Sequence, residues 1–227
     1  MQTLMAADEE VGGSGWMKER LSAAEGKVLG ALGEDERRVF EHSLTPAGVC
    51  VGRVYADVKR LRLYSAGFSW VPAGYYGWSL GERAGFLGTG KGALCKSMLM
   101  ENVKFKEGGG GERYCLVVVQ YVREIDVKKL AAEMRCLAPA KSRLPTSCFE
   151  FKVAKDASGA MITGFGHNAV SPLGLATPVQ IVVDRSIKGY FFMGGGHADL
   201  KVGCEVGEFV RGVKAKVLDA SKARPGV

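Results

Sequence analysis

The chain has 227 residues, of which 47% are hydrophobic and 24% are charged, with a mean hydropathy of +0.03. This composition is typical of a globular protein and excludes collagen, a coiled coil and a chain disordered throughout. Lysine and arginine number 31 against 24 acidic residues, and the net charge of +7 is a mild bias toward polyanions.

No membrane partner and a cytoplasmic location are expected. The longest apolar runs, such as Cys115 to Val119, are far shorter than a bilayer crossing. The first fifteen residues carry acids and lack the apolar stretch of a signal peptide. The six cysteines form no CxxC pair and are predicted to be free thiols in a reducing compartment.

Two helices and a strand are expected before residue 75. Apolar residues recur at spacings of four and three from Met17 to Val28 and predict an amphipathic helix over residues 14–32. A second helix is expected over residues 35–42. Apolar and basic residues alternate from Arg60 to Tyr64, which favours a strand in a segment that ends at Pro72.

The middle of the chain predicts a short helix and a β-hairpin. Ser79 and Glu82 have the spacing of a capping box, in which each side chain satisfies a free backbone N–H at a helix start. Strands over residues 93–105 and 114–122 flank a glycine-rich loop. The second strand is apolar almost throughout, so we expect it to be central in a sheet.

Helices and strands alternate irregularly in the last part of the chain. Asp126 is expected to cap a helix with Leu130 and Met134 on one face. The later elements expected are a loop over residues 164–178, strands in VQIVVD and YFFM, and a C-terminal helix carrying Phe209, Val213 and Val217. This order predicts an α+β fold with a mixed sheet.

Three common kinds of site are disfavoured. Residues 85–91 match the GxxxxGK of a P-loop, but Gly92 replaces the hydroxyl that would hold Mg²⁺ and a helix precedes the motif. The histidines are far apart and lack closely spaced cysteines, so neither a metal nor a cofactor is expected. Cys95 adjoins Lys96, yet neighbouring strand residues point to opposite faces, which favours a core role for the thiol.

Three other stretches are unusual, and each has two open interpretations. Lys96 interrupts the apolar run ALCKSMLMENV and is either an ammonium held in a partly dry cleft or a side chain that extends from a strand edge to solvent. The loop from Thr163 to Pro178 either binds an anion through its backbone or only connects two elements. The segment from Gly194 to Lys201 either lines a cleft or forms a turn.

In this order the stretches resemble the YbaK/ProX superfamily of aminoacyl-tRNA editing domains, which includes the insertion domain of bacterial prolyl-tRNA synthetases. The matching segments are CKSMLMENV, RYCLVVVQYV, TGFGHNAVSPLGLATPVQIVVD and FFMGGGHADLKVG. These segments are most similar to those of eukaryotic members of the superfamily. The resemblance implies a strongly curved mixed sheet flanked by helices over residues 75–227. Residues 1–74 would be a helical extension with the first strand, packed on or appended to this domain.

The resemblance also implies a reaction and a site. The reaction is hydrolysis, in trans, of the ester between a wrong amino acid and the tRNA 3′-terminal adenosine. Lys96 stands in the place of the key catalytic lysine of the family. The other residues expected to bind substrate are Asn168, Ala169, Val170, Ser171 and Pro172 in a GxxxP-like loop, and Gly195, Gly196, His197 and Asp199 in a third segment. Asn168 replaces the first glycine of the loop, and asparagine is the side chain that best tolerates a left-handed backbone.

The expected mechanism needs no protein nucleophile. Lys96 would engage the terminal phosphate or the ester oxygens, and backbone N–H groups near Val170 and Ser171 would stabilise the oxyanion. A hydroxyl of the substrate ribose would activate the water. The expected partners are the aminoacyl-tRNA 3′ end and an aminoacyl-tRNA synthetase or its complex. Two alternatives stay open: a non-catalytic tRNA- or synthetase-binding subunit, and a free-standing hydrolase of small esters.

Overall fold

The computed structural model describes residues 33–225. The described helices are α2 (Glu34–Ser43), α3 (Val49–Arg60), α4 (Leu80–Phe86), α5 (Val127–Cys136), α6 (Asp156–Thr163) and α7 (Val206–Val213). The described strands are β1 (Gly67–Trp70), β2 (Cys95–Asn102), β3 (Tyr114–Gln120), β4 (Arg123–Ile125), β5 (Phe151–Val153), β6 (Gln180–Asp184), β7 (Tyr190–Gly194), β8 (Leu200–Glu205), β9 (Lys216–Leu218) and β10 (Ser221–Ala223). The helix predicted over residues 14–32 lies outside the described residues.

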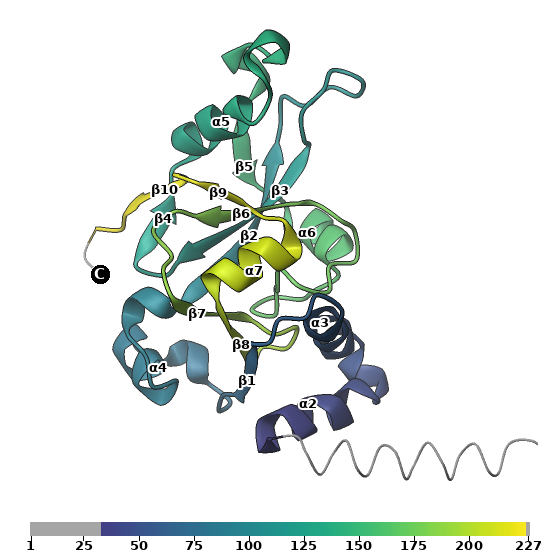
Figure 1. Cartoon of the computed structure of the whole chain (residues 1–227), viewed down its shortest axis with the longest axis vertical. Coiled ribbons are helices and arrows are strands. Elements are labelled where there is room, and N and C mark those ends of the chain that lie inside the picture. The colour runs from purple at the N-terminus through teal and green to yellow at the C-terminus, as the bar shows by residue number, and fades with distance from the viewer. Residues whose placement is uncertain (1–32, 226–227) are drawn as a thin grey trace, which may run out of the picture.

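Two sheets meet at the centre of the molecule (Figure 1). The larger has the order β5-β2-β3-β6-β9, with β2 antiparallel to both neighbours and β3, β6 and β9 parallel. The smaller is antiparallel, in the order β1-β8-β7. A parallel bridge between Leu94 and Phe192 joins the start of β2 to β7. The predicted α+β class, a curved mixed sheet flanked by helices, is confirmed.

Strand β3 is buried on both faces. Cys115 and Val117 pack on one side with Leu130 and Met134 of α5, whereas Val118 belongs to the larger core cluster on the other side. Consecutive strand residues point to opposite faces, so a strand covered on both faces needs apolar residues at every position. The predictions that this strand is central and forms an antiparallel hairpin with the preceding one are confirmed.

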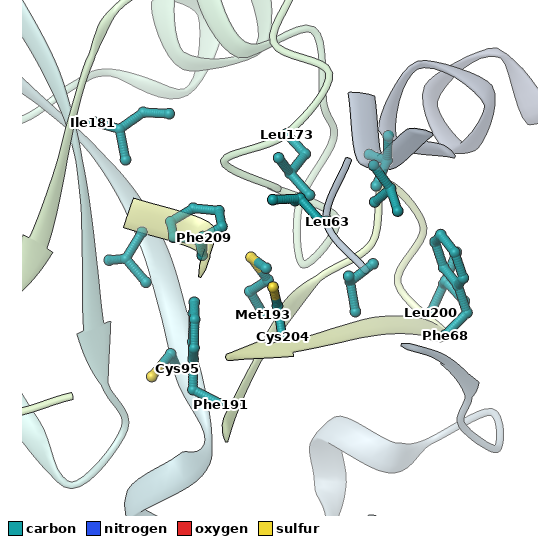
Figure 2. Packing of buried hydrophobic residues seen from close by; sticks show 14 of the residues in the cluster. Leu63, Phe68, Cys95, Leu173, Ile181, Phe191, Met193, Leu200, Cys204 and Phe209 are labelled. Atoms are coloured by element: carbon teal, nitrogen blue, oxygen red, sulfur yellow. The ribbon is translucent and has the colours of Figure 1, made fainter. Parts of the chain in front are cut away.

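The larger core cluster connects the two sheets. Figure 2 shows it reaching from Ile181 on β6 to Phe68 and Leu200 on the smaller sheet. The rings of Phe191 and Phe209 meet edge to face, with centroids 5.4 Å apart, and so fix α7 against β7. This packing sets the relative position of the sheets, and the candidate site lies where they meet.

The strand predicted at residues 60–64 is wrong. Helix α3 occupies Val49–Arg60, and its buried residues Val51, Val54 and Val58 recur at spacings of three and four. A helical stripe of this length buries more apolar area than the short alternation that follows it. Arg62 then has a φ of 54°, and the strand of this region, β1, starts only at Gly67.

The C-terminal helix is shorter than predicted. It ends at Val213 because Lys214 adopts a left-handed conformation with a φ of 54°. Val217, which was expected on the helix, lies instead in β9 beside β6. Helix α6 and strand β8 were not predicted, and β8 contains the end of the segment that was expected to line a pocket or form a turn.

Both predicted helix caps are confirmed. Ser79 and Glu82 form the reciprocal capping box at the start of α4. Asp126 accepts hydrogen bonds from the N–H groups of Lys128 and Lys129 at the start of α5. The GxxxxGK stretch begins inside α4, so a helix and not a strand precedes it.

The described part of residues 1–74 packs into the same body as the rest. Strand β1 pairs with β8, and α3 contributes three valines to the larger core cluster. The domain boundary after residue 74 stays a prediction. None of the helices within residues 33–225 combines the length and apolarity needed to span a membrane.

Candidate active site

A cavity of about 570 Å³ opens between the two sheets. Its walls come from the turn before α4, from α4 itself, from the first half of β2, from α6, from the loop over residues 164–178, from the second half of β7 and from the start of β8. Its lining combines apolar residues, among them Leu94, Leu99 and Phe192, with tyrosines and charged side chains. A cavity of this volume with both kinds of lining is typical of small-ligand sites.

Lys96 lines this cavity from the second position of β2. It stands opposite Val119 of β3, so the sheet fixes its backbone. The side chain is half-buried, and its Nζ lies 5.9 Å from the ring centroid of Tyr121. Burial lowers the pKa of the Lys96 ammonium, and the positive charge of Arg224 adds to the shift. The cleft interpretation is therefore the one that the geometry supports.

The neighbouring thiol has the predicted core role. Cys95 is 5% exposed and belongs to the larger core cluster. Burial raises the pKa of the Cys95 thiol far above its ordinary value, with a smaller contribution from the charge of Asp184. A thiolate is the nucleophilic form of cysteine, so this side chain is unsuited to attack an ester.

The predicted loop reaches the cavity through several residues, of which Asn168 and Val170 were expected to bind substrate and the others are Phe165, Gly166 and His167. Asn168 has a φ of 60°, which confirms that asparagine here adopts the left-handed backbone. Its carbonyl oxygen accepts a hydrogen bond from the hydroxyl of Tyr76 at 3.0 Å. Ser171 is fully buried, and its hydroxyl accepts the N–H of Leu173 at 3.1 Å, so it shapes the loop from within.

Helix α3 anchors this loop through two hydrogen bonds. The Asp57 carboxylate accepts the N–H of Gly174 at 2.7 Å, and the Arg53 guanidinium donates to the carbonyl oxygen of Gly164 at 2.6 Å. Both bonds join residues more than a hundred positions apart. The helix therefore fixes both ends of the loop segment that carries Asn168.

The glycines of the third segment allow backbones to approach one another. A Cβ on Gly194 would lie 2.2 Å from the carbonyl oxygen of Val170, and one on Gly196 would lie 2.8 Å from that of Cys50. A Cβ on Gly195 would lie 2.7 Å from the side chain of Leu200. The space beside these glycines is thus filled by the protein itself.

The structure brings together only part of the predicted site. Lys96, Asn168 and Val170 line the cavity. As far as residues 33–225 define it, the lining does not include Ala169, Ser171, Pro172, Gly195, Gly196, His197 or Asp199. His197 and Asp199 instead line a second, more open cavity, where the His197 ring lies 5.6 Å from that of His42. The substrate-binding role of these residues stays a prediction.

Two buried cations in the cavity wall were not named as site residues, although Lys201 ends the segment for which a cleft lining was one interpretation. Lys201 is 6% exposed, and its Nζ donates to the hydroxyl of Tyr76 at 2.7 Å and to the carbonyl oxygen of Ala198 at 3.0 Å. Burial, together with the smaller effect of the positive charge of Arg83, lowers the pKa of Lys201 to about 8. Arg83 is 8% exposed, with its guanidinium 4.6 Å from the ring centroid of Tyr121.

A sequence signal for Lys201 existed. The residue interrupts the apolar stretch from Leu200 to Cys204 in the same way that Lys96 interrupts its own strand. For Arg83 there was none, because a short amphipathic helix is expected to carry charges on one face.

Comparison with known proteins identifies the family. A model of the aminoacyl-tRNA editing domain matches residues 79–211, which is more than half of the chain. The chain belongs to this family. A search of curated proteins found no match.

Solved structures share the fold of this editing domain at low sequence identity. A "putative trans-editing enzyme for prolyl tRNA synthetase" superposes with a TM-score of 0.61 at 18% identity, over 80% of this chain and 100% of the other. A scaffold protein used for computational epitope grafting gives 0.60 at 19% identity, with the same coverage. A hypothetical protein gives 0.56 at 20% identity, over 75% of this chain and 99% of the other.

The cations of the editing domain alternate with aromatic rings. Tyr121 lies near both Lys96 and Arg83, and Tyr76 lies near both Arg83 and Lys201. Half-buried and buried cations in the same cavity as apolar side chains suit a ligand with an anionic part and an apolar part.

Proposed function

We propose that this editing domain is an aminoacyl-tRNA deacylase that hydrolyses the ester of mischarged tRNA in trans. The observation that carries the proposal is that half-buried Lys96 faces the same cavity as the loop residues Asn168 and Val170. The volume of about 570 Å³ is sufficient for an aminoacyl group and part of the terminal nucleoside.

The chemistry requires positioning and charge stabilisation. Water attacks the ester carbonyl carbon, the bond to the ribose oxygen breaks, and the proton passes to that oxygen. The Lys96 ammonium engages the terminal phosphate or the ester oxygens, and its partial burial strengthens this attraction. A backbone N–H group near Val170, which lines the cavity, stabilises the oxyanion, and a ribose hydroxyl of the substrate activates the water.

The substrate is thus the aminoacylated 3′ end of a tRNA, in the cytoplasm, with a synthetase as a further partner. The net charge of +7 supports a polyanionic substrate. A second candidate is a tRNA- or synthetase-binding subunit without turnover. It is favoured by Asn168, whose side chain stands in the cavity lining where the family pattern has glycine.

Deacylation of a panel of mischarged tRNAs by the full chain tests the proposal. Lys96→Ala should lower kcat/KM by about 100-fold or more, the usual loss on removing a transition-state charge contact. Lys91→Ala is the matched control, because Lys91 is exposed, lies five residues away and does not line the cavity. It should stay within about twofold of wild type, because a solvated charge contributes little.

The outcomes separate the alternatives. Wild-type deacylation by Lys96→Ala would refute the mechanism. Binding of every tRNA without turnover would favour the scaffold function. Hydrolysis of small aminoacyl esters with little dependence on salt would favour the small-ester hydrolase, because tRNA binding weakens steeply as salt rises.

A further inference from the structure

Arg83 and Lys201 are buried in the cavity wall without an acidic partner. Each is more than nine-tenths buried, and none of the ion pairs formed among residues 33–225 includes either side chain. The Nε of Arg83 is buried and finds no hydrogen-bond partner within the described part of the chain. Buried charges in proteins are normally paired, so these two are unusual.

The two cations also lie close to each other. Both flank the same rings: Lys201 Nζ lies 5.4 Å and 4.4 Å from the centroids of Tyr75 and Tyr76, and the Arg83 guanidinium lies 5.7 Å and 5.6 Å from them. The tyrosine faces attract a cation but provide only part of the charge compensation that a carboxylate would give. A bound anion would relieve the remaining repulsion.

The site has the donors that an oxyanion needs. Lys201 uses two of its three N–H bonds, on the Tyr76 hydroxyl and the Ala198 carbonyl oxygen. Arg83 keeps its Nε–H unpaired and presents a planar set of donors suited to phosphate or carboxylate. Both residues line the cavity, so a ligand in it can reach them.

We propose that Arg83 and Lys201 form an oxyanion subsite, distinct from Lys96, that holds an anionic group of the substrate. The group is either the terminal phosphate of the tRNA or a carboxylate on the side chain of the amino acid. The choice of these two anionic groups rests on the proposed function, whereas the inference that an anion binds here does not. The Tyr76 hydroxyl accepts a hydrogen bond from Lys201 and donates one to the carbonyl oxygen of Asn168. These two bonds connect the subsite to the loop expected to hold the aminoacyl group.

The lowered pKa of Lys201, about 8, fits a site in which an anion would be attracted. Burial and the charge of Arg83 both disfavour the ammonium, and a bound anion would favour it. The negative charge of Asp199 raises the pKa of Lys201 and so opposes this lowering. Asp199 lines the other cavity, however, and does not occupy the subsite.

Binding of small probes to the full chain tests the subsite without any turnover. Calorimetry compares 5′-AMP with adenosine for the phosphate, and the α-amide of glutamic acid with that of glutamine for the carboxylate, because neither pair contains a carboxylic ester that the protein could hydrolyse. At least one anionic probe should bind about tenfold tighter than its neutral counterpart. The pair that shows the difference identifies the source of the anion.

Variants assign the effect to these side chains. Lys201→Met, which keeps the length of the side chain, should remove the preference for the anion, and Lys201→Arg should keep most of it. Lys91→Ala should leave the preference unchanged. Thermal unfolding checks that each variant folds. Should Lys201→Met not fold, Arg83→Gln replaces it.

Two results would overturn the subsite: equal binding of the charged and neutral probes by wild type, or an unchanged preference in folded Lys201→Met. Anion preference in a protein that deacylates no tRNA would leave the subsite standing and remove the proposed function. Deacylation of tRNA without anion preference would leave the proposed function standing and remove the subsite.

Discussion

Replacement of Asp57 by alanine should loosen the loop that carries Asn168. The Asp57 carboxylate accepts the N–H of Gly174 at 2.7 Å, and Gly174 is buried in the structure. The carboxylate also pairs with the exposed guanidinium of Arg60 at 2.8 Å. Only the first of these interactions joins α3 to the loop.

The expected loss in the free energy of unfolding follows from these two contacts. A hydrogen bond to a charged acceptor contributes about 1.5–3 kcal/mol, and the N–H left unpaired would be buried. The exposed ion pair contributes between about 0 and 1 kcal/mol. We expect Asp57→Ala to lower the free energy of unfolding by about 2 kcal/mol, which is about a 30-fold change in the folded-to-unfolded ratio.

Equilibrium unfolding in urea measures this loss, and two variants separate its causes. Asp57→Asn keeps an acceptor oxygen without the charge and should lose about half as much free energy. Arg60→Ala removes only the ion pair and should stay within about 0.5 kcal/mol of wild type. The reasoning fails if Asp57→Ala is as stable as Arg60→Ala, or if it is destabilised while deacylation and probe binding are unaffected.

Two further substitutions test local features of the fold. Gly194→Ala would place a Cβ 2.2 Å from the Val170 carbonyl oxygen and should cost about 1–3 kcal/mol, whereas Gly77→Ala, which meets nothing within 4 Å, should be close to neutral in the same urea experiment. Asp126→Ala removes the cap of α5 and should cost about 1 kcal/mol at neutral pH. Hydrogen bonds from the backbone of Lys129 and Lys128 lower the pKa of the Asp126 carboxyl. The cap's contribution is therefore complete above the unfolded pKa of about 4 and is lost as pH falls through the lower folded value, so wild type and variant should converge in acid. A constant difference down to about pH 2 would contradict this account.

Local patterns were sufficient where the physical cause is local. The capping box at Ser79 and the cap at Asp126 need only residues two or three positions away, and both form as predicted. The continuous apolar run of β3 was sufficient to predict a central strand. At residues 60–64, by contrast, a short alternation was misleading, because the packing of the α3 stripe against the core outweighs it.

Single unusual residues also predicted part of the site. Lys96 stands out because a charge in an apolar strand is costly, and the structure places it at the cavity. Asn168 stands out because few residues accept a positive φ, and it has one. The GGG segment suggested a close approach, but the sequence did not distinguish a ligand from another backbone.

The sequence by itself predicted the fold class, the central hairpin and the helix caps, and it marked Lys96 and Asn168 as unusual, because each of these signals depends on neighbours along the chain. Tertiary structure alone decided the rest. Arg83 comes from α4 and Lys201 from β8, more than a hundred positions apart, and both lie beside the rings of Tyr75 and Tyr76. Asp57 reaches Gly174 only because α3 packs beside the loop. Such meetings depend on how whole faces pack against one another, and no spacing along the chain encodes that arrangement.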